Sequence, residues 1–187
     1  MHKFQLSFFA TILFVTSQTM AATEDINIDG MISHKNNDIG YTLTFNDFIK
    51  MPMAHIKTTT PWTKPKTKVD FEGVRVKDIL KLVGAQGRTL RMIALNDYSI
   101  DIPVSDVENY NIIFAYKMNG KKLKVRNFGP YFVIYPLDEH ASEINNPLYL
   151  SRFIWQVNKI TVLNEKEIPY SFVWNGSYIN FCCIDNS

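Results

Sequence analysis

The sequence predicts an α+β fold that is rich in strands and contains two or three short helices. Short runs in which apolar and polar residues alternate recur along the 187-residue chain, as in half-buried strands. The run from Val74 to Gly84 instead repeats its apolar residues at helical spacing. Asn119 and Gly120 separate two apolar runs, which is typical of a two-residue hairpin turn. These patterns together indicate mixed sheets with few helices.

The first part of the chain alternates predicted strands with two predicted helices. The strands cover residues 25–30, 39–45 and 54–60. Thr44 or Asn46 caps a short helix that ends at Lys50, before Pro52. The second helix stops at Gly84. Its apolar face consists of Val76, Ile79, Leu80 and Val83.

The later part of the chain is predicted to be almost entirely β-structure. The strand-bearing segments are 90–103, 111–125, 131–136, 153–163 (with a bulge) and a tail hairpin within 169–183. Residues 135–143 are predicted to form a surface loop. Asn175, Gly176 and Ser177 match a glycosylation acceptor, and the alternative interpretation is a plain hairpin turn.

The N-terminus resembles a secretory signal peptide. A basic start at His2 and Lys3 precedes an apolar run over 4–15, and small residues follow at Ala21 and Ala22. The run is shorter than the roughly 20 apolar residues that span a bilayer. We therefore expect residues 1–22 to be cleaved and residues 23–187 to form one exported, periplasmic domain. An uncleaved anchor helix is the alternative.

Composition excludes several functional classes. Lys and Arg number 20 against 18 Asp and Glu, a balance that argues against a nucleic-acid partner. Beyond the signal peptide the cysteines are Cys182 and Cys183, too few for a disulfide scaffold or a CxxC site. The histidines lie far apart, and no HExxH or GxSxG motif is present. Zinc hydrolase and serine hydrolase activities are therefore not expected.

An ordered set of segments resembles a known family. The segments are "FEGVRVKDILKLVG", "ALNDYSIDIP", "IIFAYKMNGKKL", "FGPYFVIYP" and "WQVNKITV". Their order and spacing resemble the molybdopterin-binding domain of the sulfite oxidase family, from about Phe45 to Val162, and especially its small exported members. The resemblance implies a sulfite-oxidase-type fold and a pterin-type ligand.

One departure from the family pattern concerns the metal. In catalytic members a cysteine ligates molybdenum about a dozen residues before the segment that corresponds to "FEGV". This chain has no cysteine there, and a threonine hydroxyl does not replace the soft thiolate ligand. The resemblance therefore implies pterin binding, with molybdenum not expected and enzymatic activity uncertain. Some exported relatives are thought to signal to a membrane-bound partner, including enzymes of cyclic-di-GMP metabolism.

The first candidate site is the Thr- and Pro-rich stretch around Trp62. A pterin is a flat, polar bicycle that stacks on an aromatic face, and Trp62 offers such a face. Thr59 and Thr60 offer hydroxyl groups beside it, while Pro61 and Pro65 restrict the loop. The alternative is that Trp62 covers the edge of the core and the threonines form an ordinary strand.

The second candidate site is "LNDY". Asn96 offers a donor and an acceptor to the edge of a pterin, Asp97 offers a carboxylate, and Tyr98 offers a ring or a hydroxyl group. The alternative is an Asx turn between two strands.

The third candidate region follows at "RNFGPYF" and "SRFIWQ". Gly129 permits close backbone approach to a ligand, Tyr131 borders the same region, and Trp155 is either a ligand contact or a core residue. The cations available for a cofactor phosphate are Lys124, Arg126 and Arg152.

Three functions remain open from the sequence. The first is a periplasmic pterin-binding sensor without chemistry of its own. The second is a molybdopterin-dependent oxidoreductase or its subunit. The third is an interaction module whose pocket is filled by its own side chains.

Overall fold

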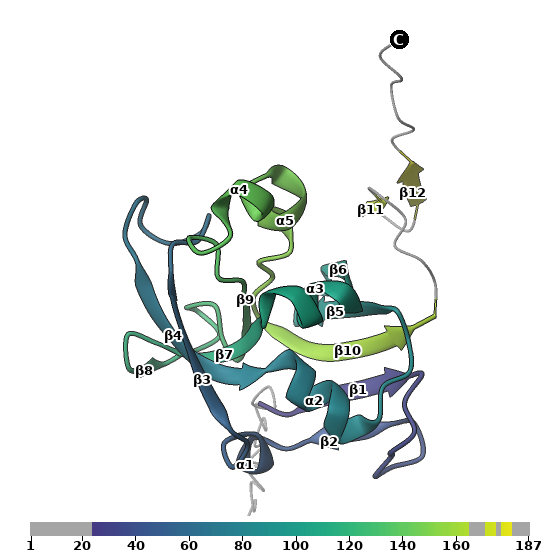
Figure 1. Cartoon of the computed structure of the whole chain (residues 1–187). Helices are drawn as coiled ribbons and strands as arrows, with labels where there is room; N and C mark the ends of the chain where they lie inside the picture. Colours follow the sequence, from purple (N-terminus) through teal and green to yellow (C-terminus); the bar gives the residue numbers. More distant parts are fainter. Residues whose placement is uncertain (1–23, 165–170, 175–176, 181–187) are drawn as a thin grey trace, which may run out of the picture.

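Two β-sheets lie side by side and share a core in the computed structural model (Figure 1). The structure describes residues 24–164, 171–174 and 177–180. The predicted signal peptide, the Asn175-Gly176 turn and both cysteines lie outside these residues. The predicted α+β class is confirmed, although the described residues form more helices than expected.

The first sheet has five strands in the order β2-β1-β10-β5-β6. They are β1 (Ile26–Gly30), β2 (Tyr41–Leu43), β5 (Thr89–Ala94), β6 (Ser99–Pro103) and β10 (Val157–Leu163). β1 and β10 are parallel, and the other pairs are antiparallel. The expected bulge in β10 is confirmed by a register shift between Val157 and Lys159. β2 is shorter than predicted because Ile39 is exposed and Phe45 already begins a helix.

The second sheet is antiparallel and is built on the predicted hairpin. Its strands are β3 (Met53–Thr58), β4 (Val69–Arg75), β7 (Ile113–Met118), β8 (Lys121–Lys122) and β9 (Phe132–Ile134). Asn119 and Gly120 connect β7 and β8 with positive φ angles of 49° and 73°, as the predicted turn requires. A separate hairpin pairs β11 (Ser171–Trp174) with β12 (Ser177–Asn180).

The described residues contain five helices. They are α1 (Phe45–Phe48), α2 (Val76–Val83), α3 (Val104–Tyr110), α4 (Ala141–Ile144) and α5 (Pro147–Ser151). Thr44 caps α1 by accepting from the Asp47 N–H at 3.2 Å, and Gly84 ends α2 at φ 59°. α3, α4 and α5 are additional, and the loop predicted over 135–143 gives way to α4. None of these described helices is long and apolar enough to cross a membrane.

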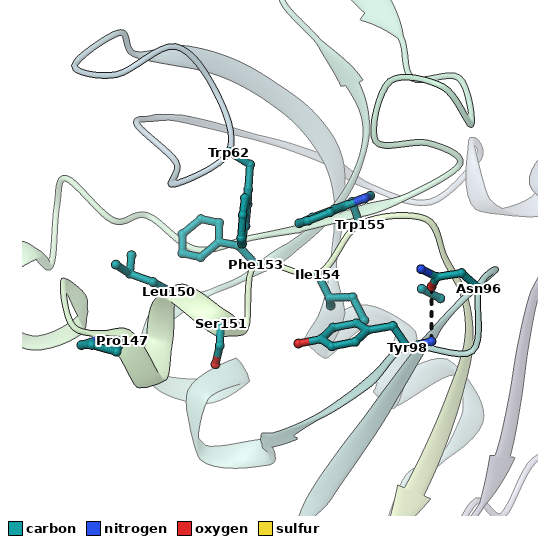
Figure 2. Close-up of a pocket in the computed structure, with 10 residues that line it drawn as sticks. Trp62, Asn96, Tyr98, Pro147, Leu150, Ser151, Phe153, Ile154 and Trp155 are labelled. Atoms are coloured by element: carbon teal, nitrogen blue, oxygen red, sulfur yellow. Dashed lines mark hydrogen bonds between the residues drawn. The ribbon is translucent and has the colours of Figure 1, made fainter. Parts of the chain in front are cut away.

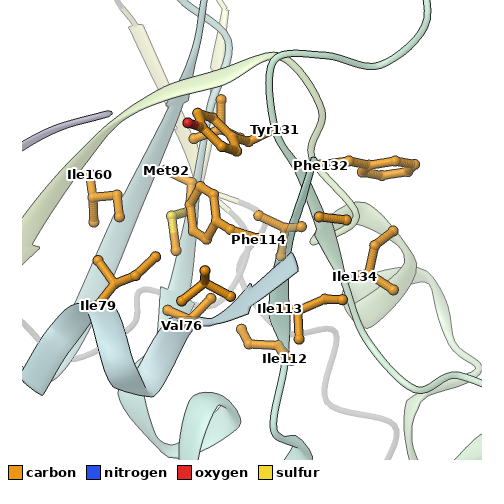
Figure 3. Close-up of a cluster of buried hydrophobic side chains, with 14 of the residues drawn as sticks. Val76, Ile79, Met92, Ile112, Ile113, Phe114, Tyr131, Phe132, Ile134 and Ile160 are labelled. Carbon is orange, nitrogen blue, oxygen red and sulfur yellow. The ribbon is translucent and has the colours of Figure 1, made fainter. Parts of the chain in front are cut away.

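The core lies where α2 packs between the two sheets. Met92 and Ile160 of the first sheet, Phe114 of the second, and Val76 and Ile79 of α2 point toward one another (Figure 3). All five side chains are fully buried. Burying such a side chain stabilises a fold by about 1.5–3 kcal/mol, so this cluster holds the two sheets together.

A carboxylate fixes the loop between β3 and β4, residues 59–68. Asp138 accepts from the Thr59 hydroxyl group at 2.7 Å and from the Thr59 N–H at 3.0 Å, while its own N–H donates to Thr58 at 3.1 Å. Lys68 lies 3.4 Å from the same carboxylate. Burial by itself raises the pKa of Asp138, but the Thr59 hydrogen bonds and Lys68 outweigh it and lower this pKa.

A buried ion pair holds the segment after α5. The Arg152 guanidinium donates to Asp106 of α3 at 2.7 Å, with side-chain exposures of 2% and 5%. Tyr135 donates its O–H to the same carboxylate oxygen at 2.8 Å. Burial raises the pKa of Asp106, although both partners favour its ionised form. The two charges lie 46 residues apart in sequence, so the pair joins α3 to the α5 region.

We predict that Arg152→Met destabilises the protein by about 3–5 kcal/mol, because it leaves the Asp106 carboxylate buried without its cation. Each kcal/mol lowers the melting temperature of a chain of this size by roughly 2–4 °C. Adding Asp106→Asn removes the charge and keeps an acceptor for Tyr135, so the double variant should recover part of the loss. Calorimetric melting of wild type, Arg152→Met and the double variant checks this prediction. Melting of Arg152→Met at the wild-type temperature would contradict it.

We predict that Asp138→Ala costs about 1–3 kcal/mol of stability at pH 7, because charge-assisted hydrogen bonds are lost. Since the folded pKa of Asp138 is lowered, its stabilisation is present above the unfolded value of about 3.9. That stabilisation is lost as the pH falls through the folded value. The difference in unfolding free energy between wild type and Asp138→Ala, measured by urea titration, should therefore shrink below about pH 4. Asp38→Ala, at an exposed position, is the matched control. A loss of stability in Asp138→Ala that stays the same in acid would refute the prediction.

Candidate functional site

A cavity of about 530 Å³ opens where three segments of the chain meet (Figure 2). The segments are the β3–β4 loop, the β5–β6 turn and the stretch from α5 to β10. The volume falls in the range of small-molecule sites, roughly 300–1,000 Å³. The wall residues are Trp62, Ala94, Asn96, Tyr98, Pro147, Leu150, Ser151, Phe153, Ile154 and Trp155.

Trp62 forms the first wall, and Thr60 holds the backbone of its turn. The buried Thr60 hydroxyl oxygen accepts from the N–H groups of Trp62 at 3.3 Å and Thr63 at 3.1 Å. Trp62 meets Trp155 edge to face, with ring centres 4.8 Å apart and planes at 64°. Trp62 is 47% exposed and lines the cavity.

The β5–β6 turn forms the second wall. Asp97 adopts a left-handed φ of 63°, and the Asn96 side-chain oxygen accepts from the Tyr98 N–H at 3.2 Å. This is the Asx turn that the sequence left open as an alternative. The Asn96 amide NH₂ has no hydrogen-bond partner among the described residues, so it is available as a donor. The Tyr98 hydroxyl group is protonated at neutral pH, as in any tyrosine, and burial raises its pKa further.

The third wall is apolar and belongs to the α5–β10 stretch. Phe153 and Ile154 are buried, and Leu150 lies beside them (Figure 2). The Ser151 hydroxyl group donates to the Leu148 carbonyl at 2.6 Å, so this group already has a backbone partner. Trp155 packs against Phe128 at 5.9 Å between ring centres. The cavity therefore combines large apolar surfaces with a few neutral polar groups.

The structure brings together four of the residues predicted from the sequence. Trp62, Asn96, Tyr98 and Trp155 all line the cavity. Thr59 and Thr60 lie in the adjoining loop, where their hydroxyl groups bind Asp138 and the turn backbone respectively. Asp97 faces solvent from its turn.

Four other predicted residues do not line the cavity. Arg126 is exposed on the loop before β9. Tyr131 is buried in the core, where its O–H donates to the Glu24 carbonyl at 2.7 Å. Arg152 points inward to its ion pair, although its neighbours line the cavity.

Gly129 is the fourth of these residues, and a glycine is required there because two stretches of backbone pack closely. A Cβ there would lie 2.7 Å from the Leu123 carbonyl carbon. The close approach at this glycine is therefore between two stretches of this chain's own backbone.

Sequence reasoning missed the contribution of α5. Pro147, Leu150 and Ser151 belong to this helix, and its start was visible in the sequence as Asn146 followed by Pro147. Asn is a favoured N-cap and proline a favoured first helical residue. The Asn146 side chain accepts from the Tyr149 N–H, as such a cap does.

Comparison with solved structures supports a known fold. The sulfane dehydrogenase SoxCD from Paracoccus pantotrophus superposes with a TM-score of 0.55 at 14% identity. The alignment covers 75% of this chain and 38% of that one, so this chain spans well under half of the enzyme's length. The likeness shows the fold alone.

Sequence comparison identifies the family. No curated protein matches. Residues 21–138 match the oxidoreductase molybdopterin binding domain, which includes Trp62, Asn96 and Tyr98 but ends before α5. The predicted sulfite-oxidase-type fold is confirmed. The match covers most of the chain, and the protein therefore belongs to the oxidoreductase molybdopterin-binding domain family.

Proposed function

We propose that this protein is an exported receptor that binds a pterin in the cavity between Trp62, Tyr98 and Trp155. The bound state would be communicated to a membrane-bound partner, such as an enzyme of cyclic-di-GMP metabolism. The observation that carries the proposal is a half-exposed indole beside neutral hydrogen-bonding groups in a cavity of about 530 Å³.

The pterin ring suits the wall chemistry. The family implies a pterin-type cofactor. Stacking of a base-like ring on an aromatic side chain is worth about 1–3 kcal/mol, and Trp62 is a half-exposed aromatic residue in the wall. The Asn96 NH₂ and the Tyr98 hydroxyl group are donors to ring nitrogens and the carbonyl oxygen of a pterin.

The metal-bearing part of molybdopterin suits the described residues less well. Thr59, in the segment where catalytic relatives place their thiolate, already binds Asp138 through its hydroxyl and N–H groups. The proposed role therefore involves recognition of the pterin, with no reaction step assigned to a metal.

Signalling requires that the partner distinguish the occupied protein from the empty one. The cavity has walls from separate segments, and a ligand that touches Trp62 and Tyr98 at once would couple the β3–β4 loop to the β5–β6 turn. Both side chains are partly exposed at present, with Tyr98 at 40%. The rim of the cavity is thus the surface on which occupancy would change what a partner meets.

We predict that pteridines raise the melting temperature and that Trp62→Ala removes most of the effect. A ligand at a hundred times its dissociation constant adds about 2.7 kcal/mol, which corresponds to a shift of several degrees. Trp62→Ala should weaken binding by about 5- to 150-fold because the stacking face is lost. Trp62→Phe keeps an aromatic face and is the control that should bind measurably. No shift with any pteridine would remove the proposal.

Family membership also supports a molybdopterin-dependent oxidoreductase or its subunit as a second candidate function. The measurement that separates the two is metal analysis after expression in a host that makes the cofactor. The receptor proposal predicts clearly substoichiometric molybdenum, because the soft thiolate ligand is absent from the matching segment. Stoichiometric molybdenum with turnover of an electron acceptor would establish the oxidoreductase instead.

A further inference from the structure

We infer that the cavity selects an uncharged, unphosphorylated pterin and discriminates against pterins that carry a phosphate ester. This inference rests on the proposed function and specifies the chemical class of its ligand. The phosphorylated class includes the pterin of molybdopterin itself. The inference follows from the charge of the walls and from the contacts of the neighbouring cations.

All ten wall residues that the structure describes are uncharged. A phosphate ester carries about −1.5 to −2 charge at pH 7. Moving that charge from water to a surface of indole rings and aliphatic side chains is unfavourable unless a cation or several N–H donors replace the lost water. Phe153 and Ile154, which form part of this surface, are buried and offer no such groups.

Two cations close to the wall in sequence, Arg152 and Lys68, contact carboxylates elsewhere. Lys64 and Lys66 of the Trp62 loop are exposed and do not line the wall. Arg152 sits between the wall residues Ser151 and Phe153, yet its guanidinium donates to Asp106 in the interior. Lys68 ends the Trp62 loop and lies 3.4 Å from the Asp138 carboxylate. If Arg152 or Lys68 were to anchor a phosphate, it would have to give up its carboxylate, which for Arg152 means breaking a buried ion pair.

The polar groups that do face the cavity are neutral donors. The Asn96 NH₂ and the Tyr98 hydroxyl group hydrogen-bond the heteroatoms of a neutral ring without requiring a counter-charge. Tyr98 also has a raised pKa because of burial, so no anion arises there at neutral pH. The donor set therefore matches the ring of a pterin and leaves a charged substituent unmatched.

The test measures the affinities of 6-hydroxymethylpterin and of its phosphate ester by titration calorimetry. These probes share one ring and differ in the charged group. The ester should bind at least about tenfold more weakly, because its charge finds no partner. Equal or tighter binding of the ester would overturn the inference and leave pterin binding intact. Failure of both probes to bind would overturn the inference, and failure of every pteridine in the melting assay would overturn the proposed function as well.

The second part of the test adds a cation to the wall and measures whether the affinity for the ester rises. Pro147 is an exposed wall residue at the start of α5, so Pro147→Lys adds a cation to the wall with little risk to the fold. Ser151→Lys is the second variant, and circular dichroism checks that both are folded. Either variant should reduce the roughly tenfold difference in affinity between 6-hydroxymethylpterin and its ester several-fold.

The matched control is Leu82→Lys, which adds the same charge on the outer face of α2, where Leu82 is 36% exposed and outside the wall. It should leave the ratio of the two affinities unchanged. An equal effect of the control and the wall variants would show that net charge decides the ratio, and would overturn the argument from the wall.

Discussion

The buried ion pair between Arg152 and Asp106 is the constraint on which the cavity depends. Two charges removed from water are costly, and they are retained only when each faces the other with good geometry, as at 2.7 Å here. Because Asp106 belongs to α3 and Arg152 follows α5, the pair fixes the apolar wall against the body of the fold. It also directs a cation away from the cavity that its neighbours line. One interaction therefore helps to position a wall and keeps one cation out of the site.

The sequence predicted most strands because alternation and turn residues are local signals. The hairpin at Asn119-Gly120, the end of α2 at Gly84 and the bulge in β10 are confirmed. α3 was missed because its buried face contains Asp106, a charged residue whose burial depends on a partner 46 residues away. Four wall residues were predictable because aromatic and amide side chains stand out in loops. The apolar remainder of the wall was not, since the same residue types fill every core.

A neutral cavity is better suited to recognition than to proton transfer. General acid–base catalysis works best when a group titrates near the working pH. Tyr98 is the titratable residue among the described wall residues, and burial moves its pKa further from neutrality. The fold is shared with oxidoreductases, yet function resides in the site that a fold carries. The wall chemistry supports the receptor role on grounds independent of the cysteine pattern.

The three walls of the cavity come from regions far apart in the sequence, around Trp62, Asn96 and Trp155. Contacts of this kind form late in folding, because long loops must close before they yield any stabilisation. A partly folded chain would contain the three wall segments but would not bring them together into the cavity. Ligand affinity would therefore report on completed tertiary structure, because the cavity exists only after the entire fold has assembled.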